Sequence, residues 1–177
     1  MAGLTTLRRF VGLDLSLTST GWAVLSEATS TPSYGRVRPG KLRGEERLVR
    51  IRTDVMAVAQ ASTLVAIEGY AFGARQGREV LGELGGVIRV ALHEAGTPFI
   101  VVAPPTLKKL ATGKGNAPKE AVLAAAIRKL GYPGSSNDEA DALWLAHMAR
   151  AVYMVQQGED VLLTNPQMAA IRKVLNV

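Results

Sequence analysis

Phe10-Val11-Gly12-Leu13-Asp14-Leu15 is an apolar run typical of a buried β-strand, yet it carries one carboxylate, Asp14. Turn-forming residues 16–20 follow, and residues 21–26 are again apolar, so the two runs predict a β-hairpin. Aspartate is depleted in strands, and one placed between two leucines needs a partner. That partner is either a turn hydrogen bond to the residues that follow or a bound cation.

The remaining pattern predicts an α/β fold with a central mixed five-stranded sheet flanked by helices. Four apolar residues in a row make 64–68 a central strand, covered on both faces. Cap residues are expected at Thr106 and Asn137, and Pro118 is expected as a first helical residue. The other strands are expected at 34–38 and 99–103, and the helices at 45–60, 78–95, 106–111, 119–130, 137–155 and 165–174.

Composition describes a globular chain with excess positive charge. With 177 residues, 47% of them hydrophobic and 20% charged, we expect one domain over 1–157 and a C-terminal extension over 158–177 with a short helix. The net charge of +6 suits a polyanionic partner. Zero cysteines exclude disulfides and thiolate metal sites. Because no apolar run is long enough to span a membrane and no secretory signal is visible, we expect a cytoplasmic protein without a membrane partner.

Three further acids stand beside apolar residues. Glu68 ends the fourth strand, and Asp138 and Asp141 open an apolar helix. Three residues apart, these two aspartates face the same way, whereas Glu139 points about 100° round the helix. Simpler explanations exist, since acids in a first turn complement the helix dipole and a strand-terminal glutamate is often solvated. Carboxylates among apolar groups are nevertheless costly, so we expect the four acids to converge on a cation.

Carboxylate oxygens suit Mg²⁺ or Mn²⁺ better than Zn²⁺. Two such ions, about 4 Å apart, could activate water and stabilise the departing oxygen in phosphodiester hydrolysis. The two histidines are expected to be structural, because His147 lies nine residues beyond Asp138, on the opposite side of the helix, and His93 lies on another helix.

Five segments in order resemble the RuvC Holliday-junction resolvases, above all the bacteriophage members. The resemblance spans about residues 9–150. The segments are Val11–Ser16, Ile67-Glu68 with the aromatics that follow, Leu81–Val87, Lys114–Glu120 and Asn137–Leu143. The resemblance implies an RNase H-like fold, a homodimer without a small-molecule cofactor, and metal-dependent nicking of branched DNA in recombination or phage DNA processing. Holliday junctions are the expected substrate, with forks and flaps as further candidates.

Matched position by position, the family's four catalytic, metal-binding acids correspond to Asp14, Glu68, Asp138 and Asp141. Lys119 matches a catalytic lysine, which would offset charge developing on the phosphate. The expected DNA-binding residues are Tyr70, Phe72, Arg75, Lys108, Lys114 and Lys119. The alternative to DNA binding for the two aromatics is core packing, which explains them equally well. For Lys108 and its neighbour Lys109, the alternative is a solvated helix face.

A second basic region supports a polyanionic partner. Residues 36–52 contain seven Arg and Lys against two Glu, and such a surface binds phosphates in a salt-dependent way. Its alternative is an exposed, soluble helix face. The basic residues are Arg36, Arg38, Lys41, Arg43, Arg47, Arg50 and Arg52.

Two other functions compete with a nuclease. An actin-like or sugar-kinase ATP-binding domain also begins with an aspartate-bearing hairpin, but residues 14–18 lack the glycine of its phosphate loop. The chain also has no internal repeat to supply its second domain. A non-catalytic binder of branched DNA would gain nothing from buried carboxylates near phosphates. We therefore favour the nuclease.

Overall fold

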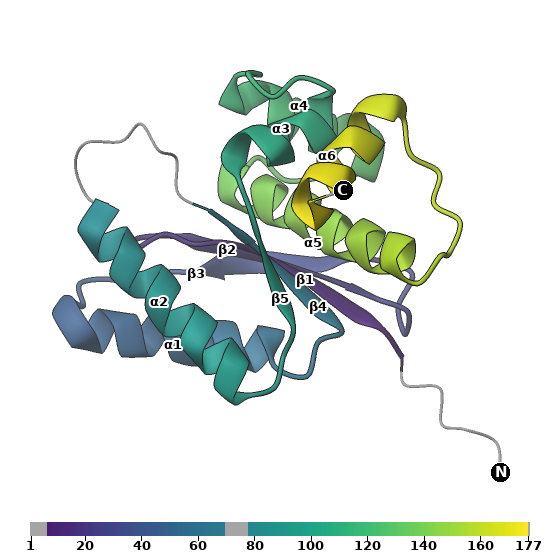
Figure 1. Cartoon of the computed structure of the whole chain (residues 1–177). Helices are drawn as coiled ribbons and strands as arrows, with labels where there is room; N and C mark the ends of the chain where they lie inside the picture. The colour runs from purple at the N-terminus through teal and green to yellow at the C-terminus, as the bar shows by residue number, and fades with distance from the viewer. Residues whose placement is uncertain (1–6, 70–77, 177) are drawn as a thin grey trace, which may run out of the picture.

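The computed structural model describes residues 7–69 and 78–176, which form one five-stranded sheet with helices on both faces (Figure 1). The strand order is β3-β2-β1-β4-β5. The first three strands pair antiparallel, and β4 runs parallel to both β1 and β5, so the predicted mixed sheet is confirmed. The strands are β1 Arg9–Asp14, β2 Thr20–Ser26, β3 Ser33–Val37, β4 Leu64–Glu68 and β5 Phe99–Val102.

Two helices cover one face of the sheet and four gather on the other (Figure 1). Along β4, Leu64 and Ala66 belong to one core cluster, while Val65 and Ile67 belong to the other. This alternation is the two-residue period of a strand, and it explains why a strand covered on both sides is apolar throughout. The helices are α1 Gly44–Ala59 and α2 Arg78–Glu94 on one face, and α3 Pro104–Thr112, α4 Lys119–Leu130, α5 Asn137–Gln156 and α6 Asn165–Leu175 on the other.

Two glycines allow α5 to rest directly on the sheet. A Cβ atom added to Gly12 of β1 would lie 2.0 Å from the carbonyl oxygen of Ala142, and one added to Gly21 of β2 would lie 2.1 Å from that of Asp138. No real side chain tolerates such distances, so only glycine lets the helix backbone come this close. The consequence is that the first turns of α5 lie over the ends of β1 and β2.

Three predicted helix starts are wrong in detail. Helix α3 begins at Pro104 after the N-cap Ala103, not at Thr106. Proline at the first helical position has its φ preset and lacks only an N–H that would be unpaired there, so the two prolines start the helix instead of preceding it. Pro118 is the N-cap of α4 and not its first helical residue.

Helix α5 is capped by Ser136 and not by the predicted Asn137. The Oγ of Ser136 accepts from the backbone N–H of Glu139 at 3.4 Å. Serine and asparagine are about equally good caps, so the composition alone could not choose between these neighbours. Helix α2 runs unbroken through its glycines, and a Cβ atom at Gly82 or Gly86 would have nothing within 4 Å.

The predicted C-terminal extension contains α6. Its Gln167 side chain accepts from the backbone N–H of Thr164 at 2.9 Å, which fixes the start of the helix. Ala170 and Ile171 are fully buried in the core cluster that α3 and α5 share, and a domain boundary at residue 157 stays a prediction. In the part of the chain that the structure describes, no helix has the length and apolar character needed to cross a membrane.

Candidate active site

Asp14 and Glu68 stand at the ends of two neighbouring parallel strands. The register of β1 and β4 pairs Leu13 with Ile67, which brings the next residue of each strand side by side. The two carboxyl groups are close enough for each to shift the pKa of the other. The carboxyl ends of parallel strands are where α/β sheets commonly bind ligands, so this edge is the natural position for a site.

Helix α5 brings Asp138 and Asp141 to the same edge. Asp141 is only 8% exposed, and its carboxylate acts electrostatically on Glu68 and is itself acted on by Asp14 and Asp138. Asp138 also acts on Asp14, so all four acids belong to one interacting cluster. Glu139 points elsewhere, as predicted, since its carboxylate contacts Arg36 and Tyr132.

The cluster is short of positive charge. Burial, then the charge of Glu68, raises the pKa of Asp14, and burial also raises the pKa of Glu68. Burial, followed by the charge of Asp14, raises the pKa of Asp141 to about 7. Two buried carboxyl groups in contact cannot both ionise cheaply, so the Asp14 and Glu68 pair retains a proton unless a cation compensates the second charge.

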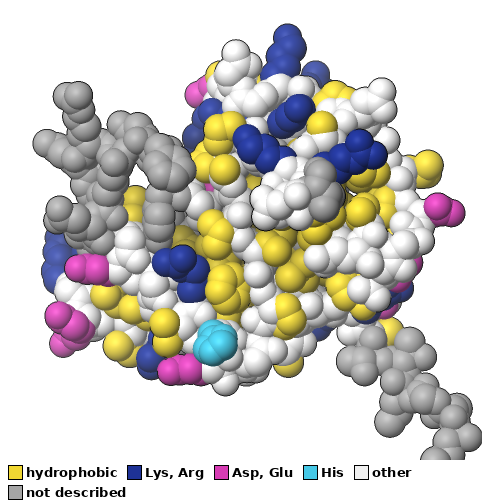
Figure 2. Space-filling view, in the orientation of Figure 1, with side chains coloured by type: hydrophobic (Ala, Val, Ile, Leu, Met, Phe, Trp, Pro, Cys, Tyr) yellow, Lys and Arg dark blue, Asp and Glu magenta, His cyan; other side chains and the backbone are white. Residues whose placement is uncertain are grey.

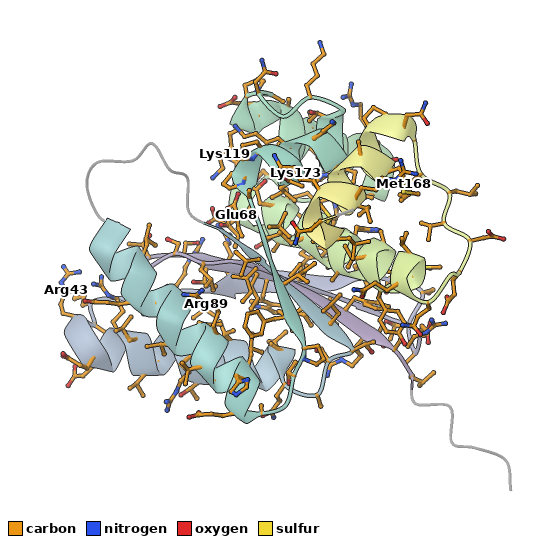
Figure 3. All side chains as sticks on the ribbon, viewed as in Figure 1. Arg43, Glu68, Arg89, Lys119, Met168 and Lys173 are labelled. Carbon is orange, nitrogen blue, oxygen red and sulfur yellow. The ribbon has the colours of Figure 1, made fainter. Side chains whose placement is uncertain are left out.

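Two lysines supply part of the missing charge. The Nζ of Lys119, the first residue of α4, lies 3.9 Å from Oδ2 of Asp141. Lys119 and Lys108 both lower the pKa values of Asp141 and Glu68. In Figure 3, Lys119 and Glu68 lie near each other where the sheet meets the upper helices. A cavity of about 130 Å³ opens between them, lined by Glu68, Leu107, Lys108, Lys119, Val122 and Asp141.

The donor set fits a hard divalent cation such as Mg²⁺ or Mn²⁺, because the acidic cluster offers only carboxylate oxygens, partly or fully buried. Within the described ranges, no group of three or more acidic or histidine side chains is already arranged as a cage that could hold a metal ion. Mg²⁺ rarely uses such a cage, since it keeps several waters and is typically bound by one or two carboxylates together with substrate phosphates. The residues that could hold it are the same four acids.

The structure thus brings five of the predicted site residues to one edge: Asp14, Glu68, Asp138, Asp141 and Lys119. Lys108 lines their cavity, so it does not simply lie on a solvated helix face, which was the alternative explanation for it. Lys114 is exposed in the loop that precedes α4, outside the cavity lining. Tyr70, Phe72 and Arg75 fall outside the described residues.

Sequence reasoning missed the polar contacts around the first turn of α5. Ser19 donates its hydroxyl to Oδ2 of Asp138 at 2.7 Å. Arg36, predicted to belong to a DNA-binding surface, lies with its Nε 3.0 Å from Oε1 of Glu139. Only the register of the hairpin, which pairs Asp14 with Gly21, could have indicated that this turn reaches α5.

A larger cavity of about 450 Å³ lies elsewhere, between α4, α5 and the segment that precedes α6. Trp144, His147 and Arg150 line it, together with apolar residues. Burial lowers the pKa of His147 to about 4, so this histidine is neutral at physiological pH. None of the four clustered acids lines this cavity, in keeping with the structural role predicted for His147.

The model of the family described as "Crossover junction endodeoxyribonuclease RuvC" matches residues 10–149. The chain is 33% identical to the crossover junction endodeoxyribonuclease RuvC of Gloeobacter violaceus, over 78% of this chain and 85% of that protein. It is also 33% identical to that of Anaeromyxobacter dehalogenans, over 82% and 83%. These relatives are bacterial, so they give no support to the predicted likeness to bacteriophage members.

Comparison with solved structures also finds RuvC. Thermus thermophilus RuvC is 25% identical, with a TM-score of 0.68 over 85% of this chain and 96% of that one. The same protein in complex with Holliday junction substrate matches with a TM-score of 0.67 over 81% and 94%, again at 25% identity. A fowlpox virus resolvase bound to Holliday junction DNA, 14% identical with a TM-score of 0.51 over 82% and 98%, shares the fold alone. The predicted RNase H-like fold is confirmed.

Proposed function

The chain belongs to the RuvC family of crossover junction endodeoxyribonucleases, and we propose that its phosphodiester-cutting centre consists of Asp14, Glu68, Asp138 and Asp141. The homologues are endonucleases that act at crossover junctions, and this chain has the same activity. The observation that carries the site assignment is the convergence of two strand ends and one helix turn on a single buried cluster of acids.

The four acids hold Mg²⁺ or Mn²⁺, with two ions in each site. Bound metal supplies an activated water and a Lewis acid for the leaving oxygen. The residues of the chain supply the other contributions to catalysis. Burial by α5 keeps bulk water away from Asp141, which strengthens every charge interaction in the site. Lys119 sits beside Asp141 with half its side chain exposed, where it can approach a phosphate and offset charge in the transition state.

Branched DNA is the substrate, with the Holliday junction first and forks and flaps as further candidates. On the face of the molecule drawn in Figure 2, several Lys and Arg side chains lie over the upper helices, with few acids among them. We assign phosphate contacts to Lys108, Lys114 and Lys119, and further DNA contacts to Tyr70, Phe72 and Arg75. Such lysines position the duplex without reading its sequence.

The enzyme works as a homodimer, because two sites related by symmetry are suited to cutting the two strands of a junction symmetrically. It acts in the cytoplasm.

A substrate panel tests the proposal. End-labelled four-way junction, fork, flap, single strand and linear duplex are incubated with the protein and Mg²⁺ under single-turnover conditions. We expect paired nicks near the centre of the four-way junction and at most slow cutting of linear duplex. Chelator should stop the cutting while leaving junction binding measurable by gel shift. Cutting that persists in chelator, or equal cutting of every substrate, would overturn the proposal.

A further inference from the structure

Polar contacts hold the first turn of α5 from two sides. On one side, the hydroxyl of Ser19 donates to Oδ2 of Asp138 at 2.7 Å. On the other side, Oε1 of Glu139 lies 3.0 Å from Nε of Arg36, and Oε2 of Glu139 accepts a hydrogen bond from the hydroxyl of Tyr132 at 2.6 Å. Asp138 is one of the proposed metal-binding acids, whereas Glu139 belongs to the same turn but points away from the cluster.

The turn that carries Ser19 is itself fixed. Thr20 is fully buried, and its Oγ1 donates to the carbonyl oxygen of Ser16 at 2.7 Å while it accepts from the backbone N–H of Ser16 at 3.0 Å. The next residue, Gly21, is the one that lets the backbone of Asp138 approach the sheet. Ser19 therefore reaches Asp138 from a closed turn with little freedom to move.

The contact on the other side is also built on a buried group. Tyr132 is 2% exposed and packs edge-on against Tyr34 with 5.1 Å between ring centroids. Its hydroxyl donates to Glu139 and accepts from the backbone N–H of Ser136 at 3.2 Å, and Ser136 is the N-cap of α5. One tyrosine hydroxyl thus ties the cap of the helix to its first turn.

We propose that Ser19 and the Arg36–Glu139–Tyr132 group are positioning residues for metal binding, which set the rotation of α5 and the orientation of the Asp138 carboxylate. This inference rests on the proposed function of Asp138. A carboxylate held through one oxygen presents the other in a defined direction, and partners of this kind typically change metal affinity or activity about 10- to 100-fold when removed. Glu139 thereby has a role although it holds no ion.

The competing explanation is that these contacts only stabilise the fold. The two differ in what they predict for metal binding: a purely structural contact alters the unfolding midpoint but leaves the metal requirement of the folded protein unchanged. Metal binding therefore has to be measured separately from stability.

The test compares Ser19→Ala, Tyr132→Phe and Glu139→Gln with two controls. Ser19→Thr keeps the hydroxyl, and Asp54→Asn weakens an exposed ion pair within α1, where Oδ2 of Asp54 lies 2.6 Å from Nε of Arg50. Two readouts are taken on each full-length protein: the Mg²⁺ concentration that gives half-maximal cleavage of a four-way junction, and the rise in unfolding midpoint that Mg²⁺ produces without DNA.

We expect Ser19→Ala to raise the half-maximal Mg²⁺ concentration about 10-fold and to reduce the metal-induced rise in midpoint. Tyr132→Phe and Glu139→Gln should change both readouts in the same direction. Ser19→Thr and Asp54→Asn should stay near wild type, and junction binding in chelator should be unchanged throughout. If Ser19→Ala, Tyr132→Phe and Glu139→Gln all leave both metal readouts at the wild-type values, the positioning role is wrong.

Asp138→Asn separates this inference from the proposed function. If Asp138→Asn cuts junctions as well as wild type, the proposed site itself is wrong, and this inference is wrong with it. If Asp138→Asn is inactive while Ser19→Ala has a normal Mg²⁺ requirement, only the inference about Ser19 is overturned.

Discussion

The carboxyl groups of Asp14 and Glu68 lie at the ends of two adjacent parallel strands, where each shifts the pKa of the other. Burial, then the charge of Glu68, raises the pKa of Asp14, so without metal this edge of the sheet holds less than its full negative charge. Burial and mutual repulsion make the ionised pair costly, and a cation removes that cost. The site is therefore expected to weaken the metal-free fold.

The first prediction is that Asp14→Asn stabilises the metal-free protein while abolishing cleavage. An asparagine carries no charge to bury and none that repels Glu68, so we expect the free energy of unfolding to rise by about 1 kcal/mol or more. Urea unfolding in chelator measures this change. A loss of stability in chelator would show that the pair is not strained by its charge.

The second prediction concerns pH. The pKa of Asp141 is raised to about 7 in the folded protein, so the folded state binds a proton more tightly than the unfolded state does. Its contribution to stability is complete below about pH 4 and is lost as pH rises to about 7 and beyond, on the order of a few kcal/mol. Unfolding in chelator across this range should show the decline, and Asp141→Asn should make it shallower.

The third prediction is that Gly21→Ala both destabilises the fold and impairs cleavage. The new Cβ would meet the carbonyl oxygen of Asp138 at 2.1 Å, so α5 must shift, at a cost of about 1–3 kcal/mol or more. Gly82→Ala in α2 is the matched control, because the new Cβ atom would lie in open space. This substitution should stabilise α2 by up to about 1 kcal/mol. Thermal unfolding and junction cleavage of both variants check this, and equal behaviour of the two would contradict the close approach of α5.

The fourth prediction concerns Lys119→Met. Loss of the ammonium group next to Asp141 should lower the single-turnover cleavage rate about 100-fold, since donors and charges aimed at a transition state have effects of this size. Junction affinity should change little, because one lysine contributes a small share of the phosphate contacts. Lys173→Met, on the exposed side of α6, is the control and should cut at the wild-type rate. A loss of affinity that accounts for the whole change in rate would assign Lys119 to binding alone.

The elements could be predicted from sequence because their patterns are local. The apolar run 64–68 and the helical spacing in 45–60 each report which face is buried, and both were confirmed to within a residue or so. Helix starts were less accurate, because Ser136 and Asn137 are equally good caps and only the packing of the loop selects one.

The four acids could be nominated from sequence, but the way they are held could not. Gly12 and Gly21 look like ordinary strand residues until the distance to α5 is known. Ser19 and Arg36 meet α5 only through long-range packing, 119 and 103 residues from the groups that they contact, whereas Tyr132 reaches Glu139 across the short loop before α5. The ion pair between Arg36 and Glu139 was not foreseen for this reason, since a surface charge pattern cannot reveal an intramolecular partner, and a DNA contact by Arg36 stays a prediction.

The most direct test is single-turnover cleavage of a labelled four-way junction by Asp141→Asn with Mg²⁺, beside wild type and with junction affinity measured for both. We expect the variant to bind the junction as wild type does, to keep its fold by circular dichroism, and to cut at least about 1,000-fold more slowly, since Asp141 is both a proposed metal ligand and the most buried acid of α5. Cleavage by Asp141→Asn at the wild-type rate would contradict the assignment of the site.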